Sequence, residues 1–475
     1  MKKLLLLCLL FLYSTFLGFS AYKIHIKAPQ LVNDSIFLAG YYNGKIYALD
    51  TLALNNKGEG VFTGNKTLDE GLYMLYLSPQ RHYDFLVGKK QDLVAKIDTN
   101  KLTLQMHGDI QTEAFIDFGT YMMQKKEEQS TLKKKQDEAK GDSIKEKAIL
   151  LEIKKLDDDV IDYQKSIAER FKGELMDLFL KALIIPQFPE ELLHSNLAEE
   201  ELQMAKYQYA KYHYWDNIDL SDIRSWRLNM LNRKLQEYLQ HIIIPNPDSI
   251  TEAAIYLIEK SKQKNIPYKY DKNKPTSYEL LVNYMIQYSV TSKMMGMDNL
   301  MVALADKYYF TGEAPWADST IMANIATEVK KVRHNLIGMT AANLPLKKYD
   351  GNTFNIHDIK SKCTLLYFYE PSCGHCKEVT PKLYNQVYQK YKSKGLEIIA
   401  MYIMTDKKEW KDFLDKHQLF DWINAWDPNR QSFYWQFFDT STTPGIYLLD
   451  KDKKIIAKKI DIPSVEKILE IELNK

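Results

Sequence analysis

Two cysteines separated by two residues, Cys373 and Cys376, form the pattern in this sequence most able to do chemistry. A CxxC pair can close a disulfide within one helical turn, or it can supply half of a structural metal site. A zinc site of the paired-CxxC type needs a second cysteine pair, which the sequence lacks, and no two histidines stand at ligand spacing. Metal binding is therefore disfavoured, and a redox-active dithiol is the favoured interpretation.

The residues around the pair predict a junction between a strand and a helix. Residues 363–371, CTLLYFYEP, form a continuous apolar run of the length expected for a strand buried on both faces. Helical spacing follows at Cys376, Val379, Leu383, Val387 and Tyr391, with Gly395 as a stop signal. Cys373 is therefore expected at the N-terminus of a helix, where unsatisfied N–H groups and the helix dipole favour a thiolate.

The first 20 residues have the composition of a secretory signal peptide. Two lysines precede a mostly apolar run, and small residues stand just before Ala21. The alternative, an uncleaved membrane anchor, is disfavoured because the run is short for a membrane span. An exported chain would keep three cysteines in a compartment where disulfides persist. Three cysteines do not provide a framework of structural disulfides.

Length and charge limit the remaining classes of function. At 475 residues the chain is too long for one ordinary core, so a multidomain protein is expected. A net charge of +2, without a basic patch interleaved with aromatic residues, gives no general attraction to nucleic acid.

Hydrophobic periodicity divides the rest of the chain into three parts. Residues 21–110 alternate with period two and carry a hairpin signal at Asn43, which predicts a small antiparallel β domain with the architecture of a sandwich. Residues 111–335 have helical periodicity and begin with a charged helical hairpin that turns near Gly141. Residues 336–475 alternate strands and helices, which predicts an α/β domain containing parallel strands.

The segment from residue 336 to 475 resembles the thioredoxin superfamily, most closely the exported thioredoxins of the TlpA/ResA type. Pro381, five residues after Cys376, matches the helix-kinking proline of thioredoxins, and Thr443-Pro444 stands where the family has its cis-proline facing the dithiol. Residues 396–440 look like the extra element of TlpA-type proteins. The whole order of signal, β domain, helical domain and thioredoxin domain is similar to multidomain redoxin proteins of Gram-negative bacteria, which implies a periplasmic protein.

The resemblance implies a thiol–disulfide oxidoreductase that reduces or isomerises disulfides of exported proteins. Cys373 would attack a substrate disulfide, and Cys376 would resolve the mixed disulfide that forms. Thr443 and Pro444 would shape the substrate-binding edge beside the dithiol. The expected enzyme needs no bound cofactor and no metal, and it would receive electrons from another dithiol protein, expected to be a membrane-spanning carrier.

Three positions depart from the thioredoxin pattern. Tyr367 stands where thioredoxins carry a buried aspartate that helps to deprotonate the second cysteine, so we expect Glu370 to take over that role. Ser372 replaces the aromatic residue that usually precedes the motif and makes the docking rim less apolar. His375 gives CGHC, which is typical of protein disulfide isomerases, and its imidazole is expected to stabilise the Cys373 thiolate.

Two other classes of function stay open. Related folds reduce peroxides, so a thiol peroxidase is an alternative, although that chemistry normally uses a lone cysteine supported by threonine. A binding or scaffold protein, in which residues 21–335 matter most and the redox domain is accessory, is the other.

Overall fold

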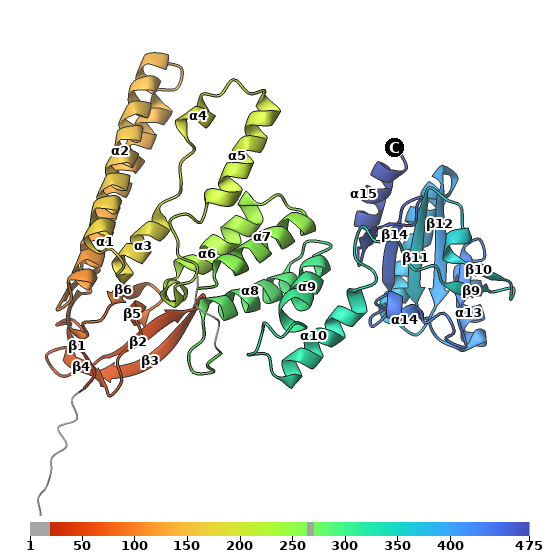
Figure 1. Ribbon diagram of the computed structural model, residues 1–475, viewed down its shortest axis with the longest axis horizontal. Coiled ribbons are helices and arrows are strands. Elements are labelled where there is room, and N and C mark those ends of the chain that lie inside the picture. The colour runs from red at the N-terminus through yellow and green to blue at the C-terminus, as the bar shows by residue number, and fades with distance from the viewer. Residues whose placement is uncertain (1–19, 264–269, 475) are drawn as a thin grey trace, which may run out of the picture. The chain divides into compact units, whose positions relative to one another are not determined.

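The computed structural model describes residues 20–263 and 270–474 (Figure 1). The predicted signal peptide, residues 1–20, lies outside these ranges except for Ser20. The chain forms two compact units, of which the first ends at Tyr238 and the second begins at Leu239. This division runs through the helical segment predicted for residues 111–335, and the three domain boundaries expected from the sequence stay predictions. None of the helices in the described ranges is both long enough and apolar enough to cross a bilayer.

The first unit opens with two four-stranded sheets, ordered β4-β1-β7-β8 and β3-β2-β5-β6. Their strands are β1 (Tyr22–Lys27), β2 (Ser35–Tyr42), β3 (Lys45–Ala53), β4 (Glu59–Gly64), β5 (Gly71–Ser78), β6 (Arg81–Val87), β7 (Asp92–Asp98) and β8 (Thr103–His107). Side chains from both sheets, among them Ile24 of β1 and Phe85 of β6, share one buried core. The predicted β domain is therefore confirmed as two packed sheets.

Two details of this domain follow from its local chemistry. Asn43 and Gly44 both have positive φ, 48° and 72°, as the tight turn of the β2–β3 hairpin requires. The pair β1–β7 departs from the predicted antiparallel arrangement, because these two strands run parallel. A parallel pair needs a long connection, and here strands β2 to β6 supply it.

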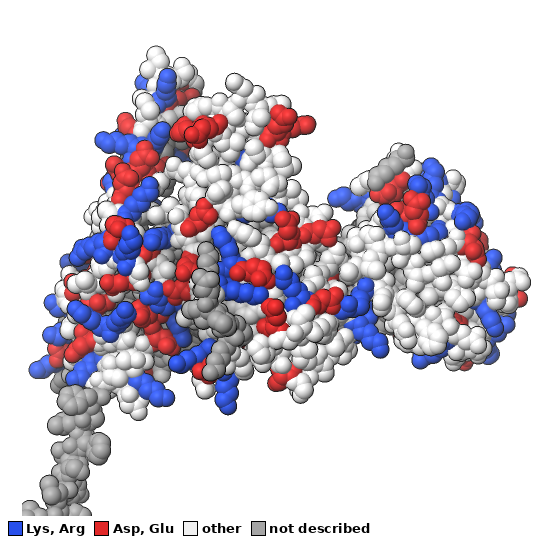
Figure 2. Space-filling view, in the orientation of Figure 1, with Lys and Arg blue, Asp and Glu red and all other residues white. Residues whose placement is uncertain are grey.

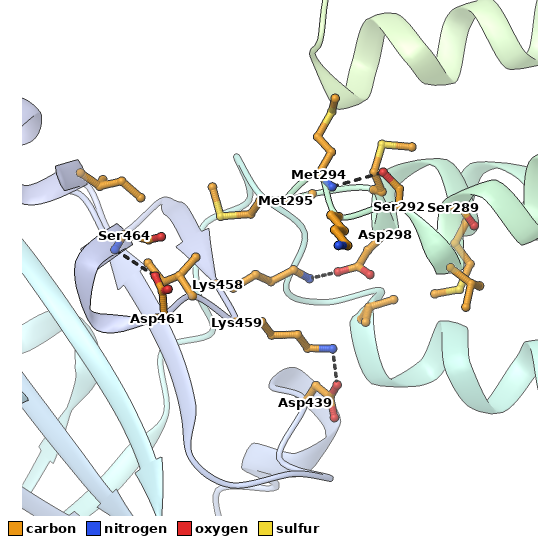
Figure 3. Close-up of a pocket in the computed structure, with 18 of the residues that line it drawn as sticks. Ser289, Ser292, Met294, Met295, Asp298, Asp439, Lys458, Lys459, Asp461 and Ser464 are labelled. Carbon is orange, nitrogen blue, oxygen red and sulfur yellow. Dashed lines mark hydrogen bonds and ion pairs between the residues drawn. The ribbon is translucent and has the colours of Figure 1, made fainter. Parts of the chain in front are cut away.

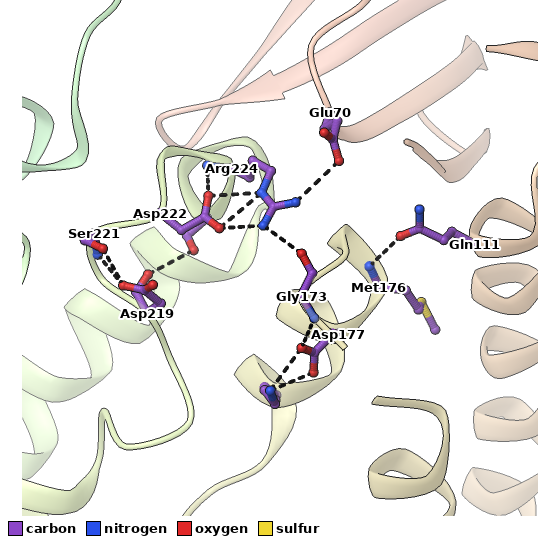
Figure 4. A network of polar contacts seen from close by, with 11 residues as sticks. Glu70, Gln111, Gly173, Met176, Asp177, Asp219, Ser221, Asp222 and Arg224 are labelled. Atoms are coloured by element: carbon purple, nitrogen blue, oxygen red, sulfur yellow. Dashed lines mark hydrogen bonds and ion pairs between the residues drawn. The ribbon is translucent and has the colours of Figure 1, made fainter. Parts of the chain in front are cut away.

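Helices complete the first unit. The predicted hairpin is formed by α1 (Ile110–Glu138) and α2 (Ser143–Arg170), with Gly141 between them at φ 94°. Next come α3 (Leu175–Leu183), α4 (Glu190–Leu193), α5 (Glu199–His213) and α6 (Met230–Glu237). Figure 4 shows Arg224 joining three parts of this unit: it pairs with Asp222 at 2.7 Å and with Glu70 at 3.4 Å, and it donates to the Gly173 carbonyl.

The second unit begins with helices, as the sequence predicted. They are α7 (Pro247–Lys260), α8 (Ser277–Thr291), α9 (Asp298–Leu304) and α10 (Ser319–Val332). Asn246 is the N-cap residue of α7: its side chain accepts hydrogen bonds from the amides of Asp248 and Ser249, and Pro247 stands at the first helical position.

A mixed α/β domain follows. Its seven-stranded sheet has the order β10-β9-β13-β12-β11-β14-β15. The strands are β9 (Pro345–Lys348), β10 (Thr353–Asn355), β11 (Cys363–Tyr369), β12 (Leu396–Tyr402), β13 (Ile423–Trp426), β14 (Gly445–Leu449) and β15 (Ile455–Lys458), and the helices are α11 (Gly374–Lys382), α12 (Gln389–Tyr391), α13 (Lys407–His417), α14 (Tyr434–Phe437) and α15 (Ile462–Glu472). This arrangement confirms the multidomain class with a thioredoxin-like C-terminal fold.

The sheet brings several loops to one edge. β11, β12 and β13 run parallel to one another, and β14 runs antiparallel to β11. The carboxyl ends of the parallel strands and the amino end of β14 therefore meet at the same edge of the sheet. All seven residues of β11 are buried, and they alternate between a core on the α11 side and a core on the opposite face.

Charged side chains of both signs are interspersed over the face seen in Figure 2, which agrees with the small net charge.

Candidate redox site

The dithiol lies at the strand-to-helix junction that the sequence predicted. Cys373 is the N-cap residue of α11, and Cys376 is in the first turn of that helix. The two thiols are not joined in the structure. Pro381 lies inside α11 and has no N–H for the helical ladder, and a π-helical turn, residues 383–388, follows directly. The helical path ends at Gly395, whose φ is 110°.

The loop before β14 meets Cys373 through Thr443. The Cys373 thiol donates to the Thr443 carbonyl oxygen at 3.4 Å. The peptide bond between Thr443 and Pro444 is cis, as the resemblance implied. The Thr443 hydroxyl in turn donates to Oε1 of Glu370 at 3.1 Å. Three of the residues singled out from the sequence thus come together around one thiol.

The two thiols have opposite environments. Partial burial opposes ionisation of Cys373, but the Thr443 side chain and the amides of Cys376 and His375 outweigh it, so the Cys373 pKa lies below its usual value. Cys376 is fully buried, and burial is the main cause that raises its pKa to about 12. The negative charge of Cys373 adds to this rise. One thiol is therefore prepared to react and the other is held protonated.

A tyrosine and a threonine occupy the core beneath Cys376. Tyr367 is fully buried, and its hydroxyl lies 2.8 Å from Oγ1 of Thr380. Burial raises the pKa of Tyr367, so this residue stays neutral and cannot accept a proton as an aspartate would. Sequence reasoning noticed Tyr367 but missed Thr380. The signal was present, because Thr380 follows Cys376 by four residues and so lies on the same face of α11.

Glu370 and His375 differ in how the structure places them. Glu370 is half-buried, its backbone contributes to the environment of Cys376, and its carboxylate accepts the hydrogen bond from Thr443. His375 is exposed, and the group that it directs to Cys373 is its backbone N–H. The expected role of the His375 imidazole thus has no counterpart in these contacts, whereas its amide has one. Ser372 is exposed beside the motif.

A second feature that the sequence did not reveal is the anchor of the loop containing Pro444. Asp439 is 8% exposed, and its Oδ1 accepts hydrogen bonds from the amide and the hydroxyl of Ser441 at 3.1 and 2.6 Å. Its Oδ2 pairs with Lys459 at 2.7 Å, an ion pair visible in Figure 3. Burial opposes ionisation of Asp439, but these contacts outweigh it and lower the pKa of the carboxyl.

A groove of about 720 Å³ lies beside the same loop. Pro444 and Gly445 form one side of it, and Val379 and Lys382 of α11 form another. It thus lies next to the Pro444 edge that the resemblance assigned to substrate. For metals, residues 20–263 and 270–474 contain no cluster of three or more His, Cys, Asp or Glu side chains suited to hold an ion.

Comparison with known proteins supports this description. Residues 361–455 match a family model described as thioredoxin-like. A thiol-disulfide oxidoreductase ResA of Bacillus cereus is 29% identical over 132 residues, which cover 28% of this chain and 74% of that protein. ResA of Bacillus thuringiensis subsp. konkukian is 30% identical over 120 residues, 25% of this chain and 67% of that protein.

A solved domain of a possible thiol-disulfide isomerase from Cytophaga hutchinsonii is 33% identical and covers 29% of this chain and 92% of that one, with a TM-score of 0.27. The family match spans β11 and α11, the two elements that meet at the CxxC pair. The chain therefore belongs, through its C-terminal domain, to the thioredoxin-like thiol–disulfide oxidoreductases.

Proposed function

We propose that this protein is a periplasmic enzyme that reduces or isomerises disulfides of exported proteins through its CGHC dithiol. Cys373 is the attacking thiol and Cys376 the resolving thiol. The signal-like first 20 residues support the location, and the named activity of the ResA relatives supports the reaction class. Electrons are supplied by another dithiol protein, for which we propose a membrane-spanning carrier.

The observation that carries this proposal is the contrast between the two thiols. Cys373 is half-buried at a helix N-terminus and has a lowered pKa, whereas Cys376 is fully buried with a pKa of about 12. The thiolate is the nucleophile in disulfide exchange. A substrate disulfide that approaches the Pro444 edge therefore meets the reactive thiol first.

The proposed reaction balances without a further cofactor. The Cys373 thiolate attacks one sulfur of the substrate disulfide, that S–S bond breaks, and the departing substrate thiolate takes a proton from solvent. Cys376 then loses its proton and attacks the Cys373 sulfur, which forms the enzyme disulfide and releases the second substrate thiolate. Two electrons pass from the dithiol to the substrate.

Resolution needs Cys376 to lose a proton that its surroundings hold firmly. Formation of the mixed disulfide removes the negative charge of Cys373, and this charge is one of the causes that raise the Cys376 pKa. We propose Glu370 as the proton acceptor, since its backbone lies against the Cys376 thiol and Thr443 holds its carboxylate. In isomerisation, a different thiolate of the same substrate attacks the substrate sulfur of the mixed disulfide instead. A new substrate disulfide forms, the Cys373 thiolate is released, and Cys376 remains a thiol.

Reduction of insulin by the pre-reduced protein tests this proposal. We expect the Cys373→Ser variant to lose activity by more than about 100-fold, because the attacking sulfur is gone. Cys363→Ala is the matched control, because Cys363 is a buried thiol at the start of β11 outside the CxxC pair, and it should keep most of the activity. Equal loss of activity in both variants would contradict the proposed role of Cys373. Consumption of hydrogen peroxide in place of insulin reduction would contradict the proposed reaction and favour a thiol peroxidase.

A further inference from the structure

A second cavity, of about 920 Å³, adjoins the groove beside Pro444 within the second unit (Figure 3). The two cavities share four lining residues: Asp439, Lys459, Ile460 and Asp461. One wall of the second cavity comes from the end of β15 and from α15, and the other comes from the turn between α8 and α9. The cavity beside the loop that contains Pro444 therefore adjoins a cavity lined by the helical segment.

Four methionines contribute to the helical wall of this cavity. The lining includes Met294, Met295, Met297 and Met301, here called the methionine wall. Met295 is 37% exposed, and across the cavity Ile471 of α15 is 55% exposed. Methionine side chains are flexible and polarizable, so surfaces rich in them adapt to apolar partners of different shapes. Exposed apolar side chains on both sides of one cleft are an energetic cost that a bound apolar chain would relieve.

The turn between α8 and α9 packs closely against its neighbours at Gly296. Gly296 has φ 88°, and a Cβ atom at this position would lie 2.9 Å from Cγ of Pro247 and 3.2 Å from Cδ1 of Ile337. Only glycine combines this backbone conformation with so close an approach. Contacts with Pro247 and Ile337 thus fix the position of the turn that lines the cavity.

A buried lysine ties the same turn to the α/β domain. The Lys458 side chain is 2% exposed, and its Nζ lies 2.6 Å from Asp298 (Figure 3). The same Nζ donates to Oδ1 of Asn335 at 2.8 Å. Such a charge is tolerated in a protein interior only when it is paired and hydrogen-bonded. Lys458 and Lys459 both have carboxylate partners in this region, so neither supplies an unpaired positive charge for an anionic surface.

We propose that the methionine wall and α15 bind an extended apolar segment of a partly unfolded polypeptide client while a disulfide of the same client reaches Cys373. The inference rests on the proposed function and names the class of its substrate. The adjacent positions of the two cavities favour a polypeptide, because one extended chain is long enough to occupy both and to pass Pro444 on the way to the dithiol. The methionine wall and Ile471 offer such a segment an apolar surface, and Lys293 and Lys467 also line the cavity.

The first test measures binding without any thiol chemistry. The probe is fluorescently labelled, reduced and carboxymethylated α-lactalbumin, and the readout is fluorescence anisotropy with the full chain. We expect the double variant Met294→Asp/Met295→Asp to weaken binding at least about 5-fold, because it places charge on the apolar wall. Met123→Asp is the control, because Met123 is 70% exposed on α1 in the first unit, and it should leave the affinity nearly unchanged.

Three results would overturn the proposal. The first is an affinity that changes equally in the double variant and in the control. The second is a double variant that binds the polypeptide normally but loses binding to phosphatidylglycerol vesicles, which would assign the wall to lipid. The third is normal polypeptide binding together with loss of a dimer in analytical ultracentrifugation, which would assign the wall to a second copy of the chain.

The second test separates the wall from the dithiol by kinetics. With scrambled ribonuclease A as substrate, the double variant should raise KM at least about 5-fold with kcat nearly unchanged, because the wall supplies binding that is equal in the ground and transition states. The rate with the small disulfide 5,5′-dithiobis(2-nitrobenzoate) should stay nearly the same. Equal losses with both substrates would place the damage at the dithiol and contradict the inference. If the unmodified protein reduced neither substrate, the proposed function would fail, and the thiol-independent binding test would still decide the role of the wall.

Discussion

The Cys373 thiol lies 3.4 Å from the carbonyl oxygen of Thr443, so two segments 70 residues apart in the chain meet at the reactive sulfur. Thr443 touches this site in two further ways: its side chain lowers the Cys373 pKa, and its hydroxyl donates to Glu370. A hydroxyl has a single proton, so it can serve the carboxylate or the thiolate but not both at once. Thr443 is therefore the residue whose alteration should report most clearly on thiolate stability.

Replacement of Thr443 by valine should raise the Cys373 pKa. A lost neutral hydrogen bond is worth about 0.5–1.5 kcal/mol, and one pKa unit corresponds to about 1.4 kcal/mol, so a rise of roughly 0.5–1 unit is expected. The rate of alkylation by iodoacetamide, followed against pH, gives this pKa directly. Because the thiolate fraction falls when the pKa rises, the variant should react more slowly at neutral pH. Thr443→Ser keeps the hydroxyl and should stay near the unmodified value; a valine variant that behaves like the serine variant would rule out this role.

Two substitutions of His375 distinguish its imidazole from its amide. His375→Ala removes the exposed ring but keeps the N–H that lowers the Cys373 pKa, whereas His375→Pro removes both. Loss of thiolate stabilisation makes the couple more reducing, and about 30 mV corresponds to about 1.4 kcal/mol. We expect the proline variant to shift the potential by tens of millivolts and the alanine variant by less, as measured by glutathione equilibration. Equal shifts of the potential in the two variants would mean that the imidazole stabilises the Cys373 thiolate, as the CGHC resemblance first suggested.

Loss of the Lys458 side chain should loosen the helical segment. Lys458→Ala leaves Asp298 and Asn335 without their partner, and breaking a buried pair in this way costs about 2–4 kcal/mol when one side is partly exposed. Hydrogen exchange of amides in α9 and α10 should accelerate accordingly. Lys454→Ala removes an exposed lysine from the same region and should leave that exchange unchanged. If the amides of α9 and α10 exchanged slowly in both variants, the Lys458–Asp298 ion pair would not be what stabilises this helical segment.

The domain boundary predicted near residue 336 can be tested by comparing two fragments, residues 336–475 and residues 239–475. Residues 336–475 contain the dithiol, the Pro444 loop and the whole seven-stranded sheet, so this fragment should fold and reduce small disulfides. It lacks Asp298 and Asn335, so its melting temperature should lie several degrees below that of residues 239–475, since about 1 kcal/mol shifts a domain of this size by roughly 2–8 °C. Equal melting temperatures would show that the helical segment contributes no stability to the α/β domain.

Local chemistry was enough to predict the reactive half of the site. An apolar strand run, a CxxC pair and a helical repeat each obey a short-range rule, and together they predicted β11, α11 and the N-cap position of Cys373. The hairpin at Asn43 and the helix turn at Gly141 follow from the same kind of rule, because each needs positive φ at a particular residue.

Features that depend on distant partners could not be read in this way. Thr443 contacts Cys373 only because β14 runs antiparallel beside β11, and Lys458 pairs with Asp298 from a distant part of the sequence. The parallel pair β1–β7 likewise depends on how the second sheet connects the two strands. Periodicity gives the buried face of an element but carries no information about which distant element covers it.

Trapping of the mixed disulfide tests the roles of the two thiols without any coupled assay. Reduced Cys376→Ser protein is mixed with a peptide that carries one internal disulfide, and intact-mass spectrometry with peptide mapping follows the product. We expect a long-lived adduct of one peptide per chain through Cys373, because the attack proceeds and no resolving thiol is present. Cys373→Ser, treated in the same way, should form at most a trace. An equal yield of adduct from both variants, or an adduct through Cys376 alone, would contradict the assignment of attacking and resolving thiols.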